Sequence, residues 1–293
     1  MPPSANSAFA AVRSRRLLLA FFLLLIGASF ASGTVSYWLG IPLDDPLLTY
    51  FIFILSFSLT AAWAWWDLQQ AGVQPQHLLG RWPRGYNWGW VLGLAIALLA
   101  FSLGSGLLSY ALLYQLAPDW VAENAESLLA IDLDSRFPKL LMLLEAIALM
   151  LVAPLAEEFL FRGVLFHRWA EKWGLTPAIW LSSLLFGLGH ANPVGLTIVG
   201  VVWTLLYCHS RTLWVPIAAH FLNNATVYLL TRIDSSPAES QTAAALTATL
   251  AAGWAPGLLL MIASAPVLGY FIYRYLPRPG AKLPYEHNAS VAR

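Results

Sequence analysis

The feature that most constrains this chain is a succession of long apolar segments separated by short polar ones. A helix needs about 20 mostly apolar residues to cross the ~30 Å hydrocarbon core of a bilayer. The apolar segments lie at 17–38, 47–66, 88–116, 139–165, 176–192, 194–209, 212–230 and 254–275. The divisions at Asn192-Pro193 and Ser210-Arg211 rest on a helix breaker and on a charge. The pattern predicts an all-α fold, a polytopic transmembrane helix bundle of about eight spans.

The composition excludes most other classes of protein. Of the 293 residues 59% are hydrophobic and only 11% are charged, whereas soluble domains are roughly 45–50% apolar and about 25% charged. A net charge of +1 without a basic patch argues against disorder and against nucleic-acid binding. Cys208 is the only cysteine, which excludes a disulfide framework and a cysteine-rich metal site. The expected surroundings are therefore a lipid bilayer, without a nucleic-acid partner.

The charges in the connections predict the orientation. Basic residues fill alternate connections: Arg13, Arg15, Arg16, Arg81, Arg84, Arg162, Arg168, Lys172, Arg211, Arg274, Arg278 and Lys282. The other connections are mostly acidic, with Asp44, Asp45, Asp119, Glu123, Glu126, Asp132 and Asp134, although Arg136, Lys139 and Arg232 run against the pattern. The positive-inside rule then places both termini in the cytoplasm.

The first apolar segment has two interpretations. Arg15 and Arg16, the run 17–26 and the small residues at 28–32 resemble a secretory signal peptide. The apolar stretch continues to Leu39, which favours an uncleaved anchor. Short loops and the lack of an organellar address favour a multi-pass protein of the bacterial inner (plasma) membrane.

Several polar residues lie where a transmembrane helix would exclude them. The segment 139–165 contains Glu145, Glu157, Glu158 and Arg162, and later segments contain His190, His220, Asn223 and Asn224. Ionisable groups are costly within a bilayer, so each is a candidate functional residue. No partner is evident for Glu145.

Glu157 and Glu158 are expected to differ in role. Glu158 and Arg162 are four residues apart, so they share a helix face and can form an ion pair. Glu157 points about 100° away and has no partner within its helix. A lone carboxylate in an apolar setting can accept a proton from water. The alternative is a pair of charges that reach the aqueous interface at the helix end.

The histidines follow the same four-residue spacing. Phe186 and His190 share one helix face, and Gly187 with Gly189 permits another backbone to approach closely. His220 and Asn224 share a face of a later helix. A single histidine in a span is more often structural, but together the groups comprise a base, two imidazoles and an amide. Such a set can activate water and stabilise an oxyanion during acyl transfer.

These motifs resemble those of a known family. Glu157-Glu158-x-x-x-Arg162, Phe186-x-x-x-His190 and His220-x-x-x-Asn224 are similar, in order and spacing, to the three motifs of the CPBP membrane proteases. That family includes the CAAX-processing Ras-converting endopeptidases and the bacteriocin-processing Abi relatives. The resemblance spans 139–231 and divides the chain into an N-terminal region with three spans (1–138), a catalytic bundle (139–231), and a polar loop, last span and tail (232–293).

The resemblance implies a role for each motif residue. Glu157 and His190 would hold and activate the attacking water, while His220 and Asn224 would bind the developing oxyanion. By the same resemblance, Glu158 and Arg162 would be a supporting ion pair, and Phe186 would pack beside His190.

Members of the family have been described both as metalloproteases and as metal-independent glutamate proteases. Glu157, His190 and His220 are the possible zinc ligands, but no His-Glu-x-x-His segment is present. The spread of the ligands over three helices favours a mechanism without a metal.

The function predicted is an intramembrane endopeptidase that uses activated water to cleave a membrane-associated or lipid-anchored peptide or protein. The alternatives are a non-proteolytic protein, such as a bacteriocin-immunity factor or scaffold, and a proton-coupled transporter. One difficulty is depth: in a simple layout His190 lies on the order of 10 Å from the level of Glu157 and His220. The motifs then meet only if the fifth segment is tilted or sunk, or if Pro154 bends the fourth.

Overall fold

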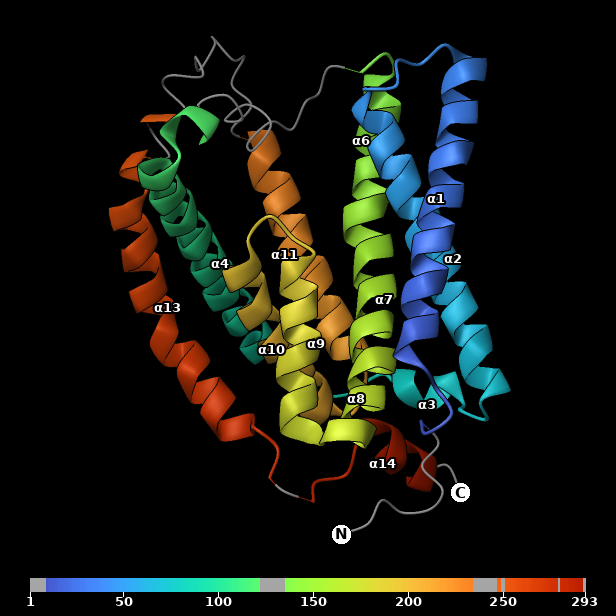
Figure 1. The fold of residues 1–293 in the computed structure, drawn as a ribbon. Coiled ribbons are helices and arrows are strands. Elements are labelled where there is room, and N and C mark those ends of the chain that lie inside the picture. Colours follow the sequence, from blue (N-terminus) through green and yellow to red (C-terminus); the bar gives the residue numbers. More distant parts are fainter. Residues whose placement is uncertain (1–8, 122–134, 234–246, 249–250, 279, 292–293) are drawn as a thin grey trace.

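The computed structural model describes residues 9–121, 135–233, 247–248, 251–278 and 280–291, and the regular elements in these ranges are all helical. The principal helices are α1 (Ser14–Leu39), α2 (Pro46–Gln70), α3 (Pro75–Leu79), α4 (Trp88–Leu116), α6 (Pro138–Ile147), η1 (Ala148–Val152), α7 (Ala153–Glu157), η2 (Glu158–Leu165), α8 (Phe166–Trp173), α9 (Leu175–Leu188), α10 (Pro193–Ser210), α11 (Trp214–Ile233), α13 (Trp254–Tyr275) and α14 (Pro284–Val291). The prediction of an all-α membrane bundle is confirmed (Figure 1).

Each predicted apolar segment is helical, but not all of them are equally suited to span a bilayer. Within the described ranges, six helices are long and apolar enough to cross a bilayer: α1, α2, α4, the continuous run Pro138–Trp173, α10 and α13. Helix α9 has only 14 residues, and α11, with 20 residues, contains several polar ones. The total of eight spans therefore stays a prediction.

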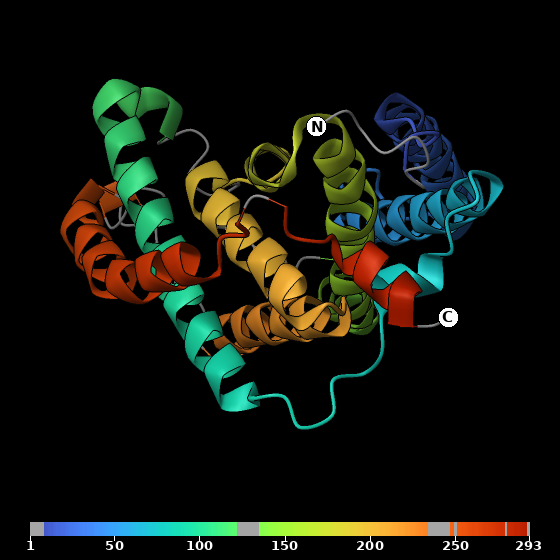
Figure 2. The same ribbon diagram turned by 90° about the horizontal axis from the view of Figure 1, so that it is seen from below.

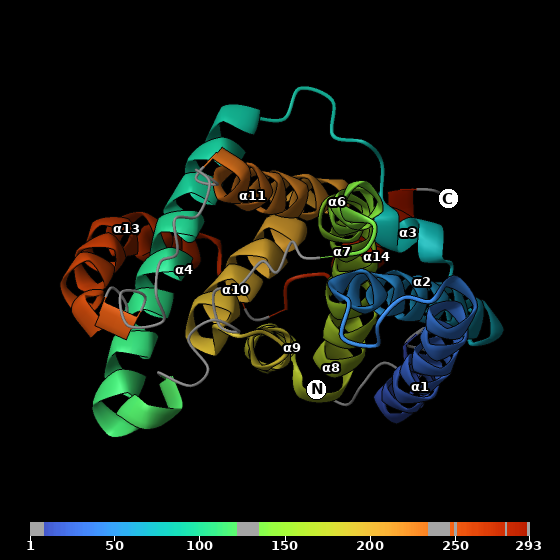
Figure 3. The same ribbon diagram turned by 90° about the horizontal axis from the view of Figure 1, so that it is seen from above.

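The bundle has two flanks and a centre. Helices α1 and α2 pack together on one flank, and α4 packs with α13 on the other (Figure 3). At the α4–α13 contact, a Cβ on Gly104 would lie 2.6 Å from the carbonyl oxygen of Gly257. The helices that contain the motifs lie between the flanks, as the view from the opposite end also shows (Figure 2).

Local sequence explains the breaks around α10. The side chain of Asn192 accepts a hydrogen bond from the Gly195 amide at 3.1 Å, and Pro193 occupies the first helical position. At the other end, Arg211 adopts a left-handed conformation with φ 60° and ends the helix. Both predicted divisions of the apolar block are confirmed.

The two ends of the described chain lie together. The rings of Phe9 and Tyr285 pack edge to face with centroids 5.2 Å apart, so both termini leave from the same end of the bundle (Figure 1). The assignment of that end to the cytoplasm stays a prediction. The acidic residues Glu123, Glu126, Asp132 and Asp134, and the predicted polar loop at 234–241, lie outside the described residues.

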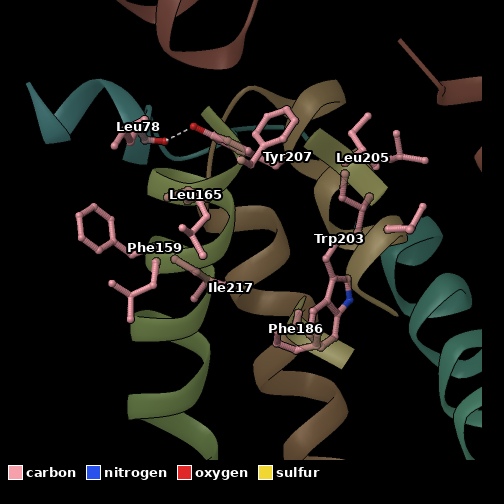
Figure 4. Close-up of a cluster of buried hydrophobic side chains, with 14 of the residues drawn as sticks. Leu78, Phe159, Leu165, Phe186, Trp203, Leu205, Tyr207 and Ile217 are labelled. Carbon is pink, nitrogen blue, oxygen red and sulfur yellow. Dashed lines mark hydrogen bonds between the residues drawn. The ribbon is translucent and has the colours of Figure 1, made fainter. Parts of the chain in front are cut away.

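The helix from 138 to 173 is irregular where it contains the first motif. Two π-helical stretches, η1 and η2, interrupt it, and Glu157 and Glu158 lie at the junction of α7 with η2. π-Helical turns are rare and occur often at functional sites, because the wider turn redirects side chains. On the C-terminal side of this junction the helix contributes Leu165 to a core that also contains Phe186, Trp203 and Tyr207 (Figure 4). The Tyr207 hydroxyl donates a hydrogen bond to the Leu78 carbonyl at 3.0 Å.

Candidate active site

The centre of the site is a carboxylate shared by two partners. Oε1 of Glu158 accepts from Nη1 of Arg162 at 3.1 Å and lies 3.0 Å from Nδ1 of His220. The predicted Glu158–Arg162 ion pair is therefore confirmed, with side chains only 0% and 1% exposed. Such depth excludes the alternative of charges that reach the aqueous interface. The link to His220 joins the first motif to the third.

Arg162 lies in a cage of acceptors and aromatic faces. Its Nη2 donates to the carbonyl of Gly200 at 3.3 Å. The guanidinium carbon is 4.4 Å from the centroid of the Phe186 ring and 5.6 Å from that of Trp203. Cation–π contacts and hydrogen bonds together offset part of the cost of burying a permanent charge.

Glu157 is buried without such support. Its side chain is 5% exposed, and Oε2 has no hydrogen-bond partner among the described residues. Buried polar atoms are normally paired, so an unpaired carboxylate oxygen requires an explanation. Oε2 of Glu158 also lacks a partner among these residues, but Oε1 of Glu158 pairs with both Arg162 and His220. Glu158 is thus tied to two neighbouring side chains, which is consistent with the supporting role predicted for it.

The short hairpin formed by α9 and α10 places His190. The residue follows the end of α9 at Leu188, in the turn that leads to α10. Figure 1 shows this turn below the upper ends of α4 and α11, so α9 stops partway through the bundle. The fifth segment is sunk, which was one of the two ways in which the motifs could meet.

Phe186 connects the three motifs. Its ring centroid is 4.6 Å from that of His190 and 6.3 Å from that of His220, in addition to its contact with Arg162. The Phe186 carbonyl also lies 2.7 Å from Nδ1 of His190. The predicted packing of Phe186 beside His190 is confirmed, and the ring does more than fill space because it orients groups from three helices.

His220 and Asn224 are held by different partners. The His220 ring stacks on Trp203 with centroids 4.3 Å apart and an interplanar angle of 27°. Nδ2 of Asn224 donates to the Leu149 carbonyl in η1 at 2.8 Å. Both side chains of the third motif therefore point toward the helix that contains Glu157, which is the arrangement that the prediction requires.

The sequence interpretation missed Trp203 and the partner of Glu145. Trp203 is one of 14 tryptophans, and no motif distinguished it from those expected at the bilayer interfaces. Glu145 is buried and pairs with Arg232, whose side chain lies over the ring of Tyr228. The sequence contained an indication of this pair, because Glu145 had no evident partner and Arg232 was an exception to the positive-inside pattern.

The possible zinc ligands do not form a cluster. Within the described part of the chain, no group of three His, Cys, Asp or Glu side chains could hold a metal ion. Nδ1 of His220 contacts Glu158, and Nδ1 of His190 contacts a backbone carbonyl. The set Glu157, His190 and His220 thus does not fit a preformed tetrahedral site.

Comparison with known proteins assigns this region to a class. Residues 139–226 match the family model described as type II CAAX prenyl endopeptidase Rce1-like. The match contains all three motifs, so this part of the chain is similar to that family. No solved structure matches the chain.

A curated relative gives the same indication. The chain is 35% identical over 83 residues to a protein named "Putative membrane peptidase YdiL" from Bacillus subtilis (strain 168). The aligned part covers 27% of this chain and 34% of that protein, so the chain matches about a third of the length of this relative.

Proposed function

We propose that this protein is an intramembrane endopeptidase of the CAAX-processing type, which hydrolyses a peptide bond of a membrane-associated or lipid-anchored substrate with activated water. The observation that carries the proposal is the buried carboxylate of Glu157, with one oxygen unpaired, beside the engaged cluster of Glu158, Arg162 and His220. The Rce1-like match and the name of the relative support it. We place the protein in the plasma membrane of a bacterium.

In this proposal Glu157 and His190 perform the first step. A carbonyl oxygen only accepts, so Nδ1 of His190 bears the hydrogen that faces the Phe186 carbonyl. Nε2 of the neutral ring then presents a lone pair, which can accept a hydrogen bond from water. His190 is also exposed, so it orients a water molecule while Glu157 accepts the proton as that water attacks the carbonyl carbon of the substrate.

The same reasoning refines the role of His220. Glu158 is a carboxylate that only accepts, so Nδ1 of His220 bears the hydrogen between them. Nε2 of a neutral ring would then be an acceptor and could not donate to an oxyanion. His220 therefore stabilises the tetrahedral intermediate only as an imidazolium, with a second hydrogen on Nε2. Asn224 supplies its amide as the second donor when substrate displaces the Leu149 carbonyl.

The test is the Glu157→Gln variant, which keeps size and hydrogen bonding but removes the proton acceptor. We expect cleavage to fall by ~10²–10⁴-fold, while insertion and the melting temperature in detergent are retained. The substrate is found by comparing the membrane peptides of cells that express the wild-type protein or the variant. Glu171→Gln, an acidic residue of α8 outside the motifs, is the matched control for loss of charge.

Three outcomes would contradict the proposal. A Glu157→Gln variant with wild-type cleavage would remove the assigned base. If the variant keeps the cellular phenotype of the wild-type protein, and no uncleaved peptide accumulates in cells that express it, the protein would have a binding function, such as immunity. Ion-driven uptake into proteoliposomes would indicate a transporter.

A further inference from the structure

A hollow outside the motif region is unusually basic. It has a volume of about 440 Å³. It lies between the start of α9, the end of α10 and the end of α13, and the segment between α13 and α14 forms the rest of its wall. This is the end of the bundle from which both described termini leave (Figure 1). Its size is within the ~300–1,000 Å³ range of small-molecule sites.

The lining provides cations without balancing acids. The basic side chains come from three separate segments, namely Arg211, Arg274, Arg278 and Lys282, with the imidazoles of His209 and His287 between them. None of the described residues that line the hollow is acidic. Within the described part of the chain, no salt bridge joins these four cations to a carboxylate.

The cations are available to a ligand. Arg274, Arg278 and Lys282 are exposed. Nη1 of Arg211 lies 2.9 and 2.8 Å from the two ring nitrogens of His287, a contact that fixes the guanidinium at the rim. Like charges gathered around a concave surface focus the electrostatic potential and attract an anion.

One side of the hollow is apolar. Leu175 and Leu276 are part of its lining, and next to it α13 exposes Tyr270 and Tyr273, the latter 85% exposed. In a membrane this outer surface of α13 contacts acyl chains. A ligand with an anionic head and an apolar tail would satisfy both sides at once, whereas a soluble anion would use only the basic one.

We propose that this hollow binds the phosphate headgroup of an anionic phospholipid, with the acyl chains lying along α13. The bound lipid joins the start of α9, the end of α10 and the end of α13. Basic pockets between transmembrane helices on the cytoplasmic side are a recurring type of site for such headgroups, and the positive-inside rule assigns this end to the cytoplasm. The site is independent of the proposed peptidase activity.

The experiment uses the purified full-length protein in a neutral detergent. Dioleoylphosphatidylglycerol is titrated in mixed micelles, and binding is followed by native mass spectrometry and by the melting temperature, with dioleoylphosphatidylcholine as the uncharged counterpart. We expect phosphatidylglycerol to be retained and to raise the melting temperature. In the variant Arg274→Gln/Arg278→Gln/Lys282→Gln the apparent affinity should fall on the order of 100-fold, from roughly fivefold for each of the three cations lost at a surface.

Two control variants separate a site from general charge. Arg15→Gln/Arg84→Gln removes exposed basic residues that do not line this hollow and should bind as the wild type does. Arg274→Lys/Arg278→Lys keeps the charge and should restore most of the affinity, which also shows that loss in the glutamine variant is not misfolding.

Specific results would overturn the proposal. If the glutamine variant binds phosphatidylglycerol as tightly as the wild type does, the basic residues of the hollow do not bind the lipid. If Arg15→Gln/Arg84→Gln loses as much affinity as the glutamine variant, the general surface potential explains the binding. If the protein retains phosphatidylcholine as well as phosphatidylglycerol, the negative charge of the headgroup is not what the hollow recognises. Saturation by inorganic phosphate or glycerol 3-phosphate, at the concentration at which phosphatidylglycerol binds, would show a site for soluble anions in place of a lipid.

Discussion

At the scale of single residues, two adjacent glutamates differ because their oxygens meet different surroundings. One oxygen of each residue lacks a partner among the described residues, but Glu158 shares its other oxygen between Arg162 and His220. These different surroundings support the separate roles proposed for the two carboxylates. The burial of both makes the engaged pair costly to disturb.

The first prediction in the mutant series concerns that pair. Glu158→Gln leaves Arg162 as an uncompensated charge in an apolar core, so the free energy of unfolding should fall by ~3–5 kcal/mol. Adding Arg162→Met removes the orphaned charge, so the double variant should be more stable than the single one. Thermal unfolding of the three proteins in the same detergent measures this. A single variant that melts with the wild type would show that the pair contributes no net stability.

At the scale of elements, the α9–α10 hairpin determines where His190 lies. The two helices approach closely at Gly187, where an added Cβ would lie 2.5 Å from the Pro193 carbonyl oxygen and 2.7 Å from the Thr197 nitrogen. The predicted close approach is confirmed at Gly187, but at Gly189 the nearest atoms to a Cβ are carbonyls of its own turn, at 3.4 Å and beyond. On the α10 side, a Cβ on Gly200 would lie 2.9 Å from the Cβ of Ser183 in α9, so Gly187 and Gly200 together permit the close contact.

Substituting Gly187 should separate the two helices. Gly187→Ala forces backbone atoms apart, and we expect a loss of ~1–3 kcal/mol in unfolding free energy together with reduced cleavage, because His190 follows the displaced turn. Differential scanning fluorimetry and the cleavage assay report the two effects.

Gly269→Ala in α13 is the matched control. No atom lies within 4 Å of a Cβ at this position, so alanine should be neutral or should stabilise the helix by up to ~1 kcal/mol. If both substitutions change stability alike, helix propensity and not the close contact of α9 with α10 explains the result.

At the scale of the whole molecule, the flanking pairs α1–α2 and α4–α13 enclose the helices that contain the motifs. The candidate site draws on three of them, since Glu157 comes from the helix 138–173, His190 from the α9–α10 turn and His220 from α11. Groups that come from separate helices move with tilts of the bundle, so they are poorly suited to the fixed distances of a tight metal site.

This arrangement leads to a prediction about metal content. The purified protein should contain much less than one equivalent of zinc, and prolonged dialysis against a strong chelator should leave cleavage unchanged. Elemental analysis and the cleavage assay before and after dialysis measure both. If zinc is stoichiometric, and activity falls on its removal and returns on its addition, His190 and His220 would become ligands and Glu157 a third ligand or the base beside the ion.

The local sequence alone determined the helical segments, their ends at Asn192 and Arg211, and the Glu158–Arg162 pair. Bilayer crossing, capping and four-residue spacing depend only on neighbours along the chain, which explains why these features are legible without a structure. The tertiary structure decided the rest. It placed His220 on Glu158, stacked it on Trp203, and joined Glu145 to Arg232.

The depth of His190 shows why such features could not be predicted. Hydropathy marks 176–192 as an apolar segment, but whether such a helix crosses the bilayer or stops within the bundle depends on the helices around it. The short α9 buries one face in the bundle and is closely packed against α10 at Gly187. Packing against neighbours far along the chain, and not the apolar character of the segment itself, brings the second motif to the level of the other two.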